Sequence, residues 1–151
     1  MSKPKYFKFG QSQREYKFTF KAQVAFESLS GLSLDRALAN VGMRTVLSQA
    51  VFVMVQACDP SVDMEEVYEL LDVQAGEKGG LDAIQEAIIE EMMVALGNPQ
   101  ADIKNYVRAI KLERAKGKRD ISQFMAKRIK DLEAEEAKEP PGPGETLKPS
   151  E

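Results

Sequence analysis

The sequence contains no histidine, and Cys58 is its single cysteine. Without histidine the chain has no His-based catalytic triad, no histidine general base and no histidine metal ligand. One cysteine can form neither an internal disulfide nor a thiolate zinc site. The sequence also lacks the GxGxxG and GxxxxGK[ST] motifs of phosphate-binding loops. We therefore expect a protein that is not an enzyme and that holds no cofactor and no metal.

Long apolar segments are missing as well. No apolar run reaches the roughly 18–20 residues of a membrane span. The basic start of the chain is not followed by the apolar core of a signal peptide, so we expect no export. The composition, 43% hydrophobic and 30% charged in 151 residues, is typical of a single modest domain with an appendage. We expect the protein in a reducing cytoplasm, with no membrane partner.

The net charge is only −3, but the two signs alternate in blocks along the chain. Residues 1–21 are basic, 22–98 acidic, 99–130 basic and 131–151 acidic. Unlike blocks can attract one another within one chain or between copies, so the charge pattern favours self-association. The Lys/Arg-rich segment 104–130 is the candidate for contacts to phosphates. Because it interleaves acids and has few aromatic residues, we favour a solvated helix face and expect no nucleic-acid partner.

The N-terminal region is predicted to form a β-hairpin, with Gly10 and the polar residues 11–15 as its connection. Aromatic residues alternate with lysine and threonine on both sides of this connection, which is the period of a strand with one apolar face. The aromatic positions are Phe7 and Phe9 before the connection, and Tyr16, Phe18 and Phe20 after it. This face either covers a helical core or contacts a partner, and the two roles do not exclude each other.

Five helices are predicted between the hairpin and Pro99, one of which begins at Asp63 and is described below. Residues 22–31 and 32–42 form short helices, each ending at a glycine. Residues 43–59 are apolar on nearly every side, which indicates a central helix. Residues 81–97 carry a wide apolar stripe and should pack against that central helix.

The stretch "QACDPSVDMEEVYELLD" (56–72) holds six carboxylates and could be read as an acid–base site. The pair Asp63 and Glu66 instead matches a helix-capping pattern, and Asp59-Pro60 ends the preceding helix. Glu65 lies in the first turn, where the helix dipole favours negative charge. We interpret the stretch as a joint between two helices.

Beyond Pro99 the pattern stays helical but becomes much more charged. We predict two helices in an extension over residues 99–138, with a break at Gly117, and a disordered Pro/Gly-rich tail over residues 139–151. Each helix of the extension has a narrow apolar stripe. The first comprises Ile103, Tyr106, Val107 and Ile110, and the second comprises Ile121, Phe124, Met125, Ile129 and Leu132. The stripes either dock on the core domain, predicted over residues 1–98, or bind a partner.

Taken in order, three segments resemble the tail assembly chaperone family of long-tailed, siphovirus-type bacteriophages and prophages. They are "YKFTFKAQVAFESLSGLSL", "DPSVDMEEVYELLD" and "LDAIQEAIIEEMMVALG", and the resemblance covers residues 15–97. It implies a small, mainly helical, non-catalytic protein of the host cytoplasm. Such a protein binds the tape measure protein, in some phages also the tail tube protein, and is absent from the mature virion. Some members are also extended by ribosomal frameshift.

We therefore predict a mainly α fold with an N-terminal β-hairpin packed on a small helical domain. The predicted function is that of a tail assembly chaperone. The alternatives are a structural virion protein, such as a tail-completion or connector subunit, and a nucleic-acid-binding regulator. The candidate partner-binding residues are Phe7, Phe9, Phe18, Phe20, Ile103, Tyr106, Val107, Ile110, Ile121, Phe124, Met125 and Ile129.

Overall fold

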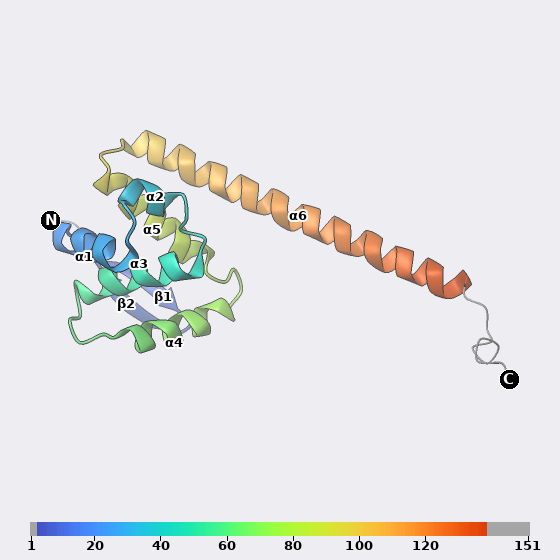
Figure 1. Cartoon of the computed structure of the whole chain (residues 1–151), viewed down its shortest axis with the longest axis horizontal. Coiled ribbons are helices and arrows are strands. Elements are labelled where there is room, and N and C mark those ends of the chain that lie inside the picture. Colours follow the sequence, from blue (N-terminus) through green and yellow to red (C-terminus); the bar gives the residue numbers. More distant parts are fainter. Residues whose placement is uncertain (1–2, 139–151) are drawn as a thin grey trace. The chain divides into compact units, whose positions relative to one another are not determined.

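The computed structural model describes residues 3–138 and is mainly α-helical, with one two-stranded antiparallel sheet at its N-terminal end (Figure 1). The elements are β1 (Lys5–Phe9), β2 (Ser12–Tyr16), α1 (Phe20–Ser30), α2 (Leu34–Leu38), α3 (Arg44–Gln56), α4 (Met64–Ala75), α5 (Asp82–Ala95) and α6 (Gln100–Lys138). The predicted fold class is thereby confirmed. One compact unit ends at Val107 and a second begins at Arg108. The tail predicted over residues 139–151 lies outside the described residues.

The hairpin closes through a tight turn at Gly10, so part of the sequence interpretation is wrong. Gly10 has φ 64°, a left-handed conformation that glycine adopts at little cost. The strands then pair with Phe7 opposite Arg14. Residues 11–15, predicted as the connection, therefore mostly form β2, while Phe18 lies beyond this strand.

Helix α3 is the centre of the first unit. Its buried side chains point in several directions, which is why the sequence is apolar nearly all round. It contacts α1, α4, α5 and β2, and the amide of Lys17 donates a 3.1 Å hydrogen bond to the carbonyl of Met54. The predicted central helix, and its packing against α5, are confirmed.

Several helix ends follow from local chemistry. Gly31 takes the left-handed conformation, φ 74°, and its amide donates to the carbonyl of Glu27 at the end of α1. The Asp63 side chain accepts a 2.8 Å hydrogen bond from the amide of Glu66, which confirms the predicted cap of α4. The second short helix is shorter than expected, because α2 ends at Leu38 and not at Gly42.

Helix α6 is continuous from Gln100 to Lys138, so the predicted break at Gly117 is wrong. A single glycine inside an exposed helix costs only about 1 kcal/mol and does not by itself end the helix. The first unit extends past Pro99, because the early α6 residues Ile103 and Val107 are 2% and 8% exposed. Within residues 3–138, no helix combines the length and apolarity that a membrane crossing requires.

Candidate partner-binding surface

The second unit presents a row of exposed apolar side chains on α6. Their exposed fractions range from 43% at Leu132 to 67% at Phe124. Successive helix residues are separated by about 100°, which places the row on one side of the helix. We call it the distal apolar face, and it consists of Ile121, Phe124, Met125, Ile129 and Leu132. Covering apolar surface of this kind with a partner lowers the free energy of the system.

Leu112 provides a natural comparison with this face. It is 65% exposed, as is Ile121, and it lies on the same helix. The helical period places Leu112 on roughly the opposite side of α6 from Ile121. The two leucine-sized side chains are therefore equally accessible but differ in whether apolar neighbours surround them.

The first stripe of the extension is placed differently from the second. Ile103 and Val107 are buried, while Tyr106 and Ile110 are half-buried. The expectation that these four residues form an accessible contact surface is corrected for Ile103 and Val107. They are part of the core of the first unit, where they anchor the start of α6.

The predicted aromatic contact surface of the hairpin also divides into core and surface. Phe7 and Phe9 are 2% and 1% exposed, so their placement on an accessible face is wrong. Phe18 is half-buried, and its ring meets that of Phe26 edge-on at a centroid distance of 6.5 Å. Phe20 is 78% exposed and begins α1. Of the four phenylalanines, only Phe20 is freely accessible.

Sequence reasoning missed a small apolar surface on α1. Val24 is 49% exposed and follows Phe20 by one helical turn. Side chains four residues apart lie on the same helix face, so the two are neighbours. The aromatic alternation predicts Phe20 as a strand residue, and in a strand its spacing of four residues to Val24 does not indicate a shared helix face.

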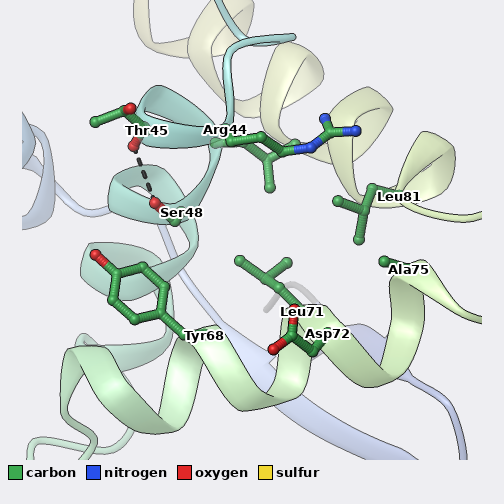
Figure 2. A pocket seen from close by; sticks show the side chains of 9 residues that line it. Arg44, Thr45, Ser48, Tyr68, Leu71, Asp72, Ala75 and Leu81 are labelled. Carbon is green, nitrogen blue, oxygen red and sulfur yellow. Dashed lines mark hydrogen bonds between the residues drawn. The ribbon is translucent and has the colours of Figure 1, made fainter.

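A groove of about 490 Å³ lies between α3, α4 and the start of α5 (Figure 2). Leu71 points from α4 into it, and Arg44 reaches across from α3 towards Leu81. The Ser48 hydroxyl donates a 3.0 Å hydrogen bond to the carbonyl of Thr45. This serine is therefore occupied by its own helix and is not positioned as a nucleophile. The groove can accommodate apolar groups beside one cationic and one anionic side chain, Arg44 and Asp72.

The acidic joint is held by structural contacts. The Asp59 carboxylate accepts hydrogen bonds from the hydroxyl and the amide of Ser61, at 2.7 and 3.1 Å. These bonds, with a smaller contribution from Arg14, lower the pKa of Asp59. Arg14 also pairs with Glu66 at 2.5 Å between Nη2 and Oε2, which links β2 to the first turn of α4. The interpretation of this stretch as a helix joint agrees with these contacts.

Reactive and metal-binding groups are sparse among residues 3–138. No cluster of three or more acidic, histidine or cysteine side chains there could hold a metal ion. Cys58 is half-buried, and desolvation raises the pKa of its thiol, with a further contribution from Glu15. A raised pKa lowers the thiolate fraction at neutral pH and hence the reactivity of Cys58.

No family model, no curated protein and no solved structure matches the chain. Its function must therefore be inferred from its own residues. The most distinctive of these in the described structure are the exposed apolar side chains of the distal apolar face, flanked by charged ones.

Proposed function

We propose that this protein is a phage tail assembly chaperone that binds the tape measure protein during tail assembly. The tail tube protein is a second proposed client. The action is binding without catalysis, in the cytoplasm of the host bacterium, and the protein leaves before the virion is complete. The resemblance of residues 15–97 to this family motivates the proposal. The distal apolar face of α6 is the structural observation that carries it.

The chemistry of this face suits a long helical client. Before assembly, such a client exposes apolar stripes that associate indiscriminately. A helix with its own exposed stripe can lie along the client and bury both surfaces, as amphipathic helices do in helix-in-groove and coiled-coil recognition. Phe124 supplies a large aromatic side chain, 67% exposed, of the kind that often dominates interface free energies.

The charge of the chain supports the same role. The net charge of −3 and the many charged side chains of α6 keep solvated groups around the apolar face. A complex in which the apolar stripes are covered and the charges remain outside stays soluble.

Co-expression tests the proposal. The tape measure protein of the same genome is produced alone and together with this chain, and its soluble fraction is measured. We expect the soluble fraction to rise with co-expression and the two proteins to co-purify. An unchanged soluble fraction together with no co-purification would contradict the proposal.

Mass spectrometry of purified particles separates the chaperone from a structural virion protein. A chaperone that leaves before completion should be absent from tails that contain the tube protein in abundance. Detection of this chain at a fixed copy number per particle would favour a connector or tail-completion subunit instead.

A further inference from the structure

The charges of α6 in the second unit are arranged with opposite signs on the two sides of the distal apolar face. On the N-terminal side, residues 111–119 contain five basic residues and one acid. On the C-terminal side, residues 131–136 contain four acids and no basic residue. Met125, 51% exposed, lies midway between these two blocks. The helix is therefore complementary to a reversed copy of itself.

We propose that a second copy of this chain covers the distal apolar face, with the two α6 helices antiparallel and related by a two-fold axis at Met125. Isologous two-fold dimers bury the same patch on both copies, and self-complementarity is what such a patch requires. The proposal concerns the chain without a client. It does not depend on the identity of any client.

Helical geometry defines the layers of this pair. With Met125 opposite its own equivalent, Ile121 of one copy lies opposite Ile129 of the other. The next layer outward places Lys118 beside Leu132, where the apolar stem of the lysine can cover the leucine. The following layer places Arg114 opposite Glu136. Successive layers thus pass from apolar contacts in the centre to opposite charges at both ends.

The angular positions of the side chains around the helix also support a two-fold axis at Met125. At about 100° per residue, Ile121 and Ile129 are each rotated by about 40° around the helix axis from Met125, in opposite directions. In an antiparallel pair the two side chains of one layer therefore lie side by side and do not collide, as in knobs-into-holes packing. From residue 114 to residue 136 the paired length is about 33 Å at 1.5 Å per residue.

A parallel pair in register buries the same apolar residues but brings like charges together. It would place the basic residues 111–119 of the two copies together and the acidic residues 131–136 together. Like charges at flanking positions disfavour such a pair, which is how natural coiled coils select their orientation. The charges therefore favour the antiparallel pair over the parallel pair.

The mass in solution gives the first test. Light scattering after gel filtration of the full chain should give twice the monomer mass of 16.8 kDa. Ile129→Glu should raise the dimer dissociation constant at least about 100-fold, because two copies of the substituted layer lose apolar burial. Leu112→Glu, on the other side of the helix, should leave the dissociation constant within about twofold. A monomeric wild-type chain at 1 mM would overturn the proposal.

Charge reversal tests the pairing at the ends. Arg114→Glu and Glu136→Arg should each weaken the dimer by about three- to tenfold, because each places like charges together in two symmetric layers. The double variant should recover the wild-type dissociation constant within about twofold. If the effects of the two single variants simply add in the double variant, the residues do not face each other and the proposed register is wrong.

Disulfide cross-linking tests the orientation. In a Cys58→Ser background, one batch of the chain carries Ile121→Cys and another carries Ile129→Cys. The two batches are mixed and oxidised. An antiparallel pair should yield mainly disulfides between a chain of one batch and a chain of the other, whereas a parallel pair would yield mainly disulfides between chains of the same batch. Circular dichroism of each variant verifies that α6 remains helical. Dominant same-batch disulfides, or a dimer that survives Ile129→Glu, would overturn the proposal.

Discussion

The ring of Phe7 stacks on the ring of Tyr16, with centroids 4.0 Å apart and planes 15° from parallel. The two residues come from the two strands of the hairpin, and they are 2% and 7% exposed. Phe9 meets Phe7 edge-on at 6.0 Å. The aromatic face of the hairpin is therefore part of the core of the first unit, and contacts with the proposed client must involve other residues.

Truncation of Phe7 should be far more costly than truncation of Phe20. Phe7→Ala removes a fully buried ring and leaves a cavity, so we expect a loss of about 3–5 kcal/mol in the free energy of unfolding. Phe20→Ala, at a side chain 78% exposed, should change it by less than about 0.5 kcal/mol. Urea denaturation monitored by circular dichroism measures both. Similar costs for the two variants would show that the hairpin is not packed as described.

Tyr16 should make the protein sensitive to alkaline pH. Desolvation, with smaller contributions from Glu91 and Glu90, raises the pKa of Tyr16 from 10.0 to about 12. Because the folded-state pKa lies above the unfolded value, the neutral phenol stabilises the fold fully below pH 10. That contribution is lost as the pH rises from 10 to 12.

The measurement is the free energy of unfolding of wild type and Tyr16→Phe between pH 8 and pH 12. The free energy of unfolding of Tyr16→Phe minus that of the wild type should be constant below pH 10. It should increase above pH 10, because only the wild type loses the contribution of the neutral phenol. A difference that stays constant up to pH 12 would show that the phenol titrates normally.

Gln74 should stabilise the first unit by joining two loops. Its Oε1 accepts a 2.8 Å hydrogen bond from the amide of Gly10 in the hairpin turn. Its Nε2 donates a 2.9 Å hydrogen bond to the carbonyl of Gly80, before α5. Gln74→Ala removes the hydrogen bonds to the Gly10 amide and the Gly80 carbonyl. We expect a loss of about 1–3 kcal/mol in the free energy of unfolding.

Glu69→Ala is the matched control, since Glu69 is exposed on the same helix α4. It should change the free energy of unfolding by less than about 0.5 kcal/mol. Equal effects at the two positions would mean that the bridge between the loops contributes nothing measurable.

Much of the fold followed from local patterns in the sequence. The cap at Asp63 and the left-handed Gly31 each have a physical cause confined to a few neighbouring residues. Such signals survive in the folded chain because tertiary packing does not compete with them. The same holds for the amphipathic pattern of α5, whose buried residues include Ile84, Ile88 and Met92.

The errors in the hairpin arose where distant residues decide the outcome, and the error in α6 arose from overweighting one residue. The polar residues 11–15 have the composition of a loop, but residues 12–15 pair with β1, and the Arg14 side chain forms an ion pair with Glu66, far along the chain. The aromatic period cannot tell which aromatic side chains face the core, so Phe7 and Phe20 looked equivalent. For α6, propensity at Gly117 suggested a break, yet the flanking residues are good helix formers and outweigh one glycine.

The most direct measurement of the proposed binding is co-purification of the tape measure protein with affinity-tagged variants of this chain. Ile121→Glu combined with Ile129→Glu places charge in the distal apolar face at exposed positions, so the fold should be kept. We expect the amount of co-purified client to fall at least about tenfold for this variant and to be unchanged for Leu112→Glu. Equal recovery of the client with all three proteins would contradict a role for the distal apolar face in client binding.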